Sequence, residues 1–171
     1  KRMGILGYGE LGQGVAGVAE AFGMQLMIAQ RPGSTEAQQN RYPLVEVLQQ
    51  ADVISLHVPL AVNTANLISE RELQMMTPDA LLINTARGGI VDEEALVDAL
   101  KSGQIGGAGF DVLSVEPPRQ GNVLLDNPMP NLIITPHVAW ASQLSRQRLL
   151  NLVVESIEDY IADAPVRRRL V

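Results

Sequence analysis

Arg87, Glu116 and His137 are the residues of this sequence whose types could do chemistry together. Arg87 stands in NTARGG, Glu116 in FDVLSVEPP and His137 in ITPHVAWAS, each after a short apolar run that predicts a buried parallel strand. Parallel α/β sheets bind ligands at the carboxyl ends of their strands, so we expect the three side chains at neighbouring strand ends. Beside a nicotinamide, a guanidinium, a carboxylate and an imidazole could bind a 2-keto acid and protonate it during reduction.

The segment GYGELG (7–12) predicts where such a nicotinamide cofactor would bind, because it has the form G-x-G-x-x-G between an expected strand and an expected helix. Gly7 permits the tight turn, Gly9 lets the backbone approach a pyrophosphate, and Gly12 allows close packing of the helix on the strand. The N–H groups at the start of the helix attract phosphates. A glycine turn without a ligand is the alternative, and the spacing of the surrounding elements favours dinucleotide binding.

Gln30 and Arg31, after the second expected strand, bear on which dinucleotide binds. NAD-specific sites place an acidic residue there, which hydrogen-bonds the ribose diol. Gln30 removes the repulsion that a carboxylate would exert on a 2′-phosphate, and Arg31 could pair with that phosphate. Arg31 could instead be solvated, or stack on the adenine of bound NAD. The sequence therefore favours NADP(H) and leaves NAD open.

The elements that must position these residues alternate along the chain. Runs of four to six apolar residues without period-two alternation suit a parallel sheet covered on both faces. The repeated strand–helix order predicts a doubly wound α/β domain of the Rossmann type. We expect this domain over residues 1–141, followed by a C-terminal helix and tail over 142–171. The expected strands are 3–6, 25–29, 52–57, 80–84, 107–112 and 131–135, and the expected helices are 11–22, 44–50, 92–103 and 142–163.

The last expected helix carries an apolar stripe at helical spacing, which predicts that the stripe packs in a core. Pro165 ends the helix, and the basic run Arg167, Arg168 and Arg169 is interpreted as a solvated tail. The residues of the stripe are Leu150, Val153, Val154, Ile157, Tyr160 and Ile161.

Composition excludes several function classes. The chain has 171 residues, of which 46% are hydrophobic and 19% charged, as in an ordinary globular domain. Its net charge of −6 argues against general nucleic-acid binding. The sequence has no cysteine, which excludes disulfides, thiolate zinc sites and a cysteine nucleophile, and no metal site is expected. Without a long apolar stretch or a signal-peptide pattern, we expect no membrane association and a cytoplasmic location.

Five motifs in order resemble the nucleotide-binding domain of the D-isomer-specific 2-hydroxyacid dehydrogenases: GYGELGQGVAGVAEAFGM, SLHVPLAVNTANLI, LLINTARGGIVDEEALVDAL, GAGFDVLSVEPP and TPHVAWAS. The resemblance runs through essentially the whole chain. It implies an NAD(P)-dependent oxidoreductase that passes hydride between the cofactor and a small 2-keto or 2-hydroxy acid. The AWAS after the histidine resembles members that act on hydroxypyruvate or glyoxylate. The family also implies a homodimer formed through the nucleotide domain.

The same resemblance implies a role for each site residue. Arg87 would bind the substrate carboxylate, His137 would be the general acid–base, and Glu116 would hydrogen-bond the imidazole and keep it protonated near neutrality. His57 is interpreted as structural or cofactor-adjacent. The implied cofactor contacts are Glu10 and Leu11 at the pyrophosphate, Val58, Pro59, Thr85 and Ala86 around the nicotinamide half, and Asp111 at its carboxamide, with Ala139 and Trp140 walling the substrate pocket.

Two other functions stay open, and so does the question of whether the chain contains the family's substrate domain. A dinucleotide-sensing transcriptional corepressor shares this fold and these residues, and a nucleotide-binding module without chemistry is the second alternative. Because the first expected strand begins at Met3, the substrate domain of the family is expected to be missing from this chain. We therefore expect a fragment that binds a dinucleotide weakly and has little turnover by itself.

Overall fold

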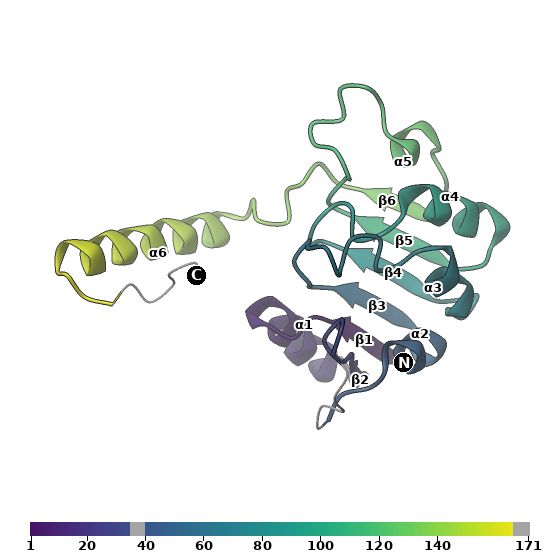
Figure 1. The fold of residues 1–171 in the computed structure, drawn as a ribbon, viewed down its shortest axis with the longest axis horizontal. Coiled ribbons are helices and arrows are strands. Elements are labelled where there is room, and N and C mark those ends of the chain that lie inside the picture. The colour runs from purple at the N-terminus through teal and green to yellow at the C-terminus, as the bar shows by residue number, and fades with distance from the viewer. Residues whose placement is uncertain (35–39, 166–171) are drawn as a thin grey trace. The chain divides into compact units, whose positions relative to one another are not determined.

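The computed structural model describes residues 1–34 and 40–165 of the chain (Figure 1). The chain folds into two compact units, Lys1–Pro136 and His137–Val171. Arg167, Arg168 and Arg169, interpreted above as a solvated tail, lie outside the described residues.

The first unit is built on one six-stranded sheet in which every strand pairing is parallel. The strand order is β2-β1-β3-β4-β5-β6, so the direction of winding reverses between β1 and β3. Such a switch point is where doubly wound sheets bind their ligands. The predicted Rossmann-type sheet is confirmed. Its strands are β1 (Arg2–Leu6), β2 (Gln25–Ile28), β3 (Val53–Leu56), β4 (Leu81–Asn84), β5 (Gly107–Phe110) and β6 (Leu132–Ile134).

Helices of the first unit cover the two faces of the sheet unequally. The helix α1 (Glu10–Ala21) packs on β1 and β2, whereas α2 (Leu44–Gln50), α3 (Glu70–Met75), α4 (Glu93–Ser102) and α5 (Val123–Asp126) pack on one another in sequence order (Figure 1). The main core lies under this second group. A smaller core lies under α1. Side chains that anchor the main core are Leu48, Ile54, Leu56, Leu73, Leu82 and Leu96, and those of the smaller core are Ile5, Ala16 and Ile28.

The helices α3 and α5 were not predicted from the sequence. Ser69 and Glu72 form a capping box at the start of α3, and this S-x-x-E pattern was the available signal. The start of α5 is capped by Asn122, whose side chain accepts a hydrogen bond from the N–H of Leu124. At four residues, α5 is too short for a periodic pattern to reveal it.

Within the first unit, the second half of the sheet is less covered by helices than β1 and β2 are. Leu81 on β4 is 41% exposed and Ile133 on β6 is 69% exposed within the described residues. The helix α1, at 12 residues, makes its main sheet contacts with β1 and β2.

The helix of the second unit, α6 (Gln143–Ile161), has no buried residue. The described part of its own unit offers no second element against which the apolar stripe could pack, so core packing of the stripe stays a prediction. Ser142 caps the helix through a hydrogen bond from the N–H of Ser145 (3.1 Å). Within 1–34 and 40–165, no helix combines the length and the apolar character that a membrane crossing requires.

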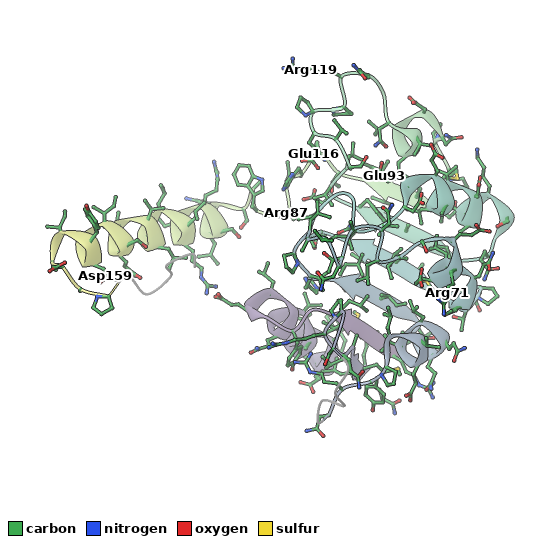
Figure 2. All side chains as sticks on the ribbon, in the orientation of Figure 1. Arg71, Arg87, Glu93, Glu116, Arg119 and Asp159 are labelled. Carbon is green, nitrogen blue, oxygen red and sulfur yellow. The ribbon has the colours of Figure 1, made fainter. Side chains whose placement is uncertain are left out.

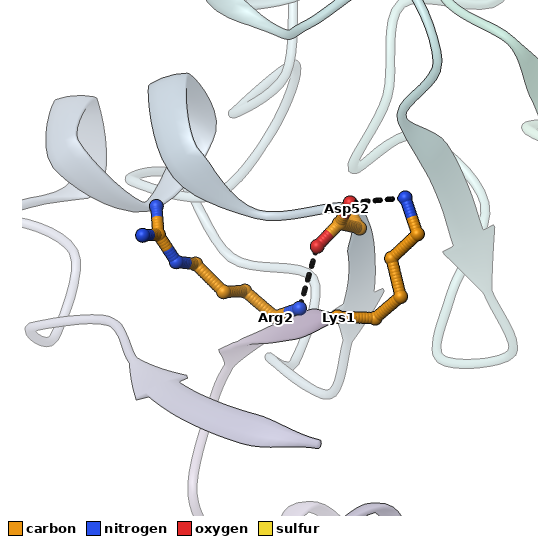
Figure 3. Close-up of polar contacts among 3 residues, drawn as sticks. All are labelled: Lys1, Arg2 and Asp52. Atoms are coloured by element: carbon orange, nitrogen blue, oxygen red, sulfur yellow. Dashed lines mark hydrogen bonds and ion pairs between the residues drawn. The ribbon is translucent and has the colours of Figure 1, made fainter.

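Asp52 fixes the amino ends of β1 and β3 (Figure 3). Its Oδ1 lies 2.6 Å from Nζ of Lys1, and its Oδ2 accepts a hydrogen bond of 2.6 Å from the backbone N–H of Arg2. The ammonium of Lys1 and this N–H lower the pKa of Asp52. The contacts align the strands at the edge opposite to their carboxyl ends.

Candidate active site

The carboxyl ends of the strands lie in one row, because Leu56 pairs with Asn84, Asn84 with Phe110, and Phe110 with Ile134. The connections that follow these strands therefore leave the sheet at the same edge. Arg87 follows β4 by three positions and Glu116 follows β5 by six, and Figure 2 shows both at this edge. His137 follows the last residue of β6 by three positions and begins the second unit.

A cavity of about 410 Å³ opens at the carboxyl ends of β1, β2 and β3, at the switch point of the sheet. Two arginines, Arg31 and Arg41, line it, and no acidic residue among those described does. A neighbouring cavity of about 240 Å³ is lined by Gln30, Arg31 and Ser34 among others, again without a described acidic residue. The larger cavity is lined by Gly7, Tyr8, Gly9, Ala29, Arg31, Pro32, Arg41, His57, Val58, Pro59, Asn63 and Thr64.

The glycine turn at this cavity has the geometry that a bound pyrophosphate needs. Gly7 has φ of +94°, and a Cβ there would lie 2.5 Å from the carbonyl of His57. A Cβ at Gly12 would overlap the carbonyl oxygen of Gly7, so α1 can approach β1 only with glycine at that position. A Cβ at Gly9 meets no atom within 4 Å, and Gly9 starts α1 without a side-chain cap. The turn therefore leaves room, and backbone N–H donors, for an anion.

Arg41 is a cavity residue that the sequence analysis missed. Its guanidinium donates a hydrogen bond to the carbonyl of Ala29 (3.2 Å) and lies 5.1 Å from the centre of the Tyr8 ring. Both contacts hold a positive charge at the wall of the cavity. No motif marks Arg41, because the fold brings it back to the end of β2 from thirteen positions further along the chain.

His57 lines the cavity and is held by Ser55, whose Oγ lies 2.9 Å from Nε2. Burial lowers the pKa of His57, which favours the neutral imidazole. The neighbouring Val58 is buried. The carbonyl of Pro59 accepts a hydrogen bond from the buried hydroxyl of Thr64 (2.6 Å), which shapes the connection after β3.

The connection that carries Arg87 is organised by the buried side chain of Asn84. Its amide donates to the carbonyl of Arg87 (3.0 Å) and accepts from the N–H of Ala86 (3.1 Å). Thr85 and the guanidinium of Arg87 are exposed, and the guanidinium donates to the carbonyl of Ala86 (2.6 Å). The sequence analysis missed this role of Asn84, although a polar residue ending an apolar strand was the available signal.

Asp111 lies buried at the end of β5. Its Oδ1 accepts a hydrogen bond of 2.5 Å from the hydroxyl of Thr135, and its backbone N–H donates to the carbonyl of Asn84 (2.9 Å). Thr135 was not predicted as a site residue. These bonds tie the ends of β4, β5 and β6 together.

Glu116 and His137 belong to different units of the chain. The exposed carboxylate of Glu116 accepts a hydrogen bond from the N–H of Leu113 (2.7 Å). His137 has φ of +53°, and its carbonyl accepts a hydrogen bond from Nε1 of Trp140 (2.7 Å). The described residues contain no group of His, Asp or Glu that could hold a metal ion.

A family model for the NAD-binding domain of D-isomer-specific 2-hydroxyacid dehydrogenases matches residues 1–139. The chain belongs to this family. It is 50% identical over 163 residues to glycerate dehydrogenase of Methylorubrum extorquens, covering 95% of this chain and 51% of that protein. It is 40% identical over 169 residues to hydroxypyruvate reductase of Blautia hydrogenotrophica, covering 97% of this chain and 52% of that protein. The structure of an acyclic imino acid reductase in complex with NADPH and D-Arg aligns with a TM-score of 0.83 at 36% identity, covering 99% of this chain and 54% of that one.

These similarities confirm the predicted family and fold. The chain spans about half the length of the curated relatives that it matches. Those relatives are named as a dehydrogenase and a reductase, and nothing among them supports the corepressor alternative. The nicotinamide cofactor class is shared by the family model and by the NADPH-bound structure.

Proposed function

We propose that this chain supplies the cofactor-binding part and the reacting side chains of an enzyme that transfers hydride between NAD(P)H and a small 2-keto acid. The substrate class is that of hydroxypyruvate and glyoxylate. In this proposal Arg87 binds the substrate carboxylate, His137 exchanges a proton with the keto oxygen, and Glu116 orients the imidazole of His137.

The observation that carries the proposal is the position of the two connections that bear Arg87 and Glu116. Both leave the sheet at the edge that also bears the dinucleotide cavity. The two connections touch, because Gly88 packs against the backbone of Leu113 and Ser114. A cation and a carboxylate at the ligand edge of a dinucleotide fold fit the reduction of an anionic keto acid. The names of the two curated relatives support the substrate class.

Each side chain has a physical reason for its proposed role. The cofactor supplies the hydride when it is bound. The guanidinium of Arg87 stays charged at any working pH and matches a carboxylate with two parallel hydrogen bonds. The imidazolium of His137 donates a proton to the keto oxygen in reduction, and the neutral ring removes it in oxidation. A carboxylate at Glu116 favours the protonated ring.

The remaining predicted site residues keep their proposed places around the cofactor and substrate. Glu10 and Leu11 contact the pyrophosphate through backbone N–H groups at the start of α1. Val58, Pro59, Thr85 and Ala86 border the nicotinamide half. Asp111 accepts a hydrogen bond from its carboxamide, and Ala139 and Trp140 wall the substrate pocket.

Steady-state kinetics of the natural full-length protein with a panel of 2-keto acids tests this function. We expect the highest kcat/KM with hydroxypyruvate or glyoxylate, and little turnover by the 171-residue chain alone. His137→Asn should lower kcat at least ~100-fold, and Arg87→Ala should raise KM and lower kcat. Arg119→Ala is the matched control, since Arg119 is an exposed arginine on the connection that carries Glu116 (Figure 2). Unchanged kcat in His137→Asn, or no turnover of any 2-keto acid, would refute the proposal.

We also propose a preference for NADP(H) over NAD(H). The cavity at the end of β2 has two arginines and no carboxylate in its described lining, so it favours a ribose that carries a phosphate. Arg31 and Gln30 were predicted to act in this way, and Arg41 adds a second charge. The similar chain solved with NADPH supports this preference.

The ratio of kcat/KM for NADPH to that for NADH tests the preference. Arg31→Gln should lower the ratio by roughly 10- to 100-fold, because it removes charge-assisted hydrogen bonds. It should leave the kinetics with NADH within about twofold. Arg71→Gln removes an exposed arginine of α3 that does not line the cavity, and it should leave the ratio unchanged. A wild-type ratio at or below one contradicts the preference.

The quaternary structure and location complete the proposal. A homodimer formed through the first unit is supported by three exposed apolar side chains on and beside α1, Leu11, Val18 and Phe22. Val18→Asp should shift the protein to monomer in sedimentation velocity, and an unchanged dimer would exclude this face. The cytoplasmic location predicted from the sequence is checked by cell fractionation.

A further inference from the structure

A buried carboxylate, Glu93, joins the connection after β4 to the connection after β5. We infer that Glu93 is a positioning residue, which fixes the loop that carries Glu116 relative to the loop that carries Arg87. The inference rests on the proposed function, in which Glu116 acts on His137. Glu93 acts through these loops and does not touch the substrate.

Glu93 is the first residue of α4 (Figure 2), and its side chain accepts hydrogen bonds from three donors on the connection after β5. The N–H of Ser114 donates to Oε1 (2.6 Å), the hydroxyl of Ser114 to Oε2 (2.8 Å), and the amide of Asn122 to Oε2 (2.7 Å). Glu93 is 9% exposed. Within the described residues no lysine or arginine forms an ion pair with it, so these donors and the start of α4 stabilise its charge.

A close backbone contact lies beside these hydrogen bonds. A Cβ at Gly88 would overlap the carbonyl group of Leu113 and lie 2.6 Å from the nitrogen of Ser114. Gly88 directly follows Arg87 in the chain, and Ser114 precedes Glu116 by two positions. The N–H of Leu113 also binds the Glu116 carboxylate. The two functional loops therefore meet at the point where Glu93 holds them.

Backbone hydrogen bonds hold the segment that leads to Glu93. The segment 89–92 is paired with residues 66–68: Asn66 N–H donates to Gly89 (2.8 Å), Ile68 N–H to Ile90 (3.1 Å), and Asp92 N–H to Ile68 (2.9 Å). Ile68 and Ile90 are fully buried. The Glu93 carboxylate therefore holds the Glu116 loop in place relative to the sheet. This loop contains no helix or strand up to Asn122.

Loss of the Glu93 bonds should displace Glu116 and leave the cofactor cavity in place. The cavity is built from residues after β1, β2 and β3 together with Arg41, and none of them contacts Glu93 through a hydrogen bond. A displacement of about 1 Å at a reacting group can lower a rate roughly 100-fold. Glu93 should thus affect kcat and its pH dependence, and not cofactor binding.

Glu93→Gln in the full-length protein tests this, because the amide keeps the shape and turns one acceptor oxygen into a donor that faces other donors. We expect kcat for keto-acid reduction to fall about 10- to 100-fold. The pH at which this rate is half-maximal should move to lower values, because a displaced Glu116 stabilises the imidazolium of His137 less. The KM for NAD(P)H should stay within about twofold.

Asn122→Asp provides a second variant and a rescue. The aspartate keeps the oxygen that caps α5 through Leu124, and it replaces the donor to Glu93 by an oxygen. Alone it should lower kcat, because two carboxylates then face each other. Combined with Glu93→Gln it restores one hydrogen bond with reversed polarity, and kcat should return to within about threefold of wild type.

Glu94→Gln is the matched control, because Glu94 is the exposed next residue of α4 and carries the same charge at the same helix start. It should change neither kcat nor the pH profile. Glu116→Gln, measured in parallel, separates the two hypotheses: if it changes nothing, the proposed role of Glu116 fails. If Glu116→Gln shifts the pH profile and Glu93→Gln does not, the positioning role of Glu93 is overturned. Should Glu93→Gln not fold, Asn122→Asp and the double variant decide, and absence of rescue counts against the inference.

Discussion

Gly7→Ala tests whether the backbone conformation and the close contacts of Gly7 are needed for stability and for dinucleotide binding. The alanine would have to adopt φ of +94°, and its Cβ would lie 2.5 Å from both C and O of His57 and 2.8 Å from N of Val58. These are backbone atoms, which cannot rotate away as a flexible side chain can. The connections after β1 and β3 would therefore have to separate.

The size of the effect follows from these distances. Ordinary contacts begin near 3.4 Å, so the two connections must part by about 0.9 Å (3.4 − 2.5). Positive φ in a residue other than glycine costs about 1–3 kcal/mol, and overpacking a tight site costs about 1–3 kcal/mol more. A loss of about 4 kcal/mol corresponds to a Tm lower by roughly 8–16 °C in a chain of this size. Because both connections line the cofactor cavity, the Kd for the dinucleotide should rise more than about 10-fold.

Gly14→Ala is the matched control, with the opposite expected sign. Gly14 lies within α1, and a Cβ there meets no atom within 4 Å. Alanine stabilises a helix interior by about 0.5–1 kcal/mol relative to glycine, so the Tm should rise by a few degrees. Thermal unfolding by circular dichroism and calorimetric titration with NADPH measure both variants. The reasoning is refuted if Gly7→Ala melts within about 2 °C of wild type, or if Gly14→Ala lowers the Tm.

Three further predictions concern stability. Burial lowers the pKa of His57 below 6.5, so the unfolded chain binds more protons and the free energy of unfolding should fall as the pH drops below about 6.5. His57→Asn should flatten that part of a urea-denaturation pH series, and an unchanged slope would contradict the assignment. Lys1 and a backbone N–H lower the pKa of Asp52 below 3.8, so its contribution is present above pH 3.8 and lost below it. Asp52→Asn should remove this acid-side loss, and a slope that persists in the variant argues against it. Thr135→Val removes a hydrogen-bond donor to buried Asp111 and should lower the free energy of unfolding by about 1–3 kcal/mol. Thr135→Ser keeps the hydroxyl and should retain most of the stability. Wild-type stability in Thr135→Val would disprove this prediction.

The elements with regular patterns were predictable from the sequence. The six strands and the helices α1, α2, α4 and α6 were all located from their apolar patterns. Asp92 accepts hydrogen bonds from the N–H groups of Glu94 and Ala95, and Gly103 ends the helix at φ of +71°. Local propensity and capping decide such features, so the sequence contains them. The helical spacing of α6 shows which of its residues share a face and not whether another element covers that face.

The same distinction, between local sequence and contacts made by the fold, applies to the residues of the candidate site. Arg87 and Glu116 were proposed because each is a functional group placed shortly after a strand, and Asp111 was proposed from the resemblance to the family. The residues that hold them were missed, and they act through bonds to other parts of the fold. Asn84 binds the turn that contains Arg87, Thr135 binds Asp111 from a neighbouring strand end, and Glu93 binds a loop 21 positions further along the chain. Such residues have no fixed spacing from the groups that they position, since the fold alone brings them together. A motif therefore suggests the chemistry proposed for this site, and the structure shows which bonds hold the loops that carry it.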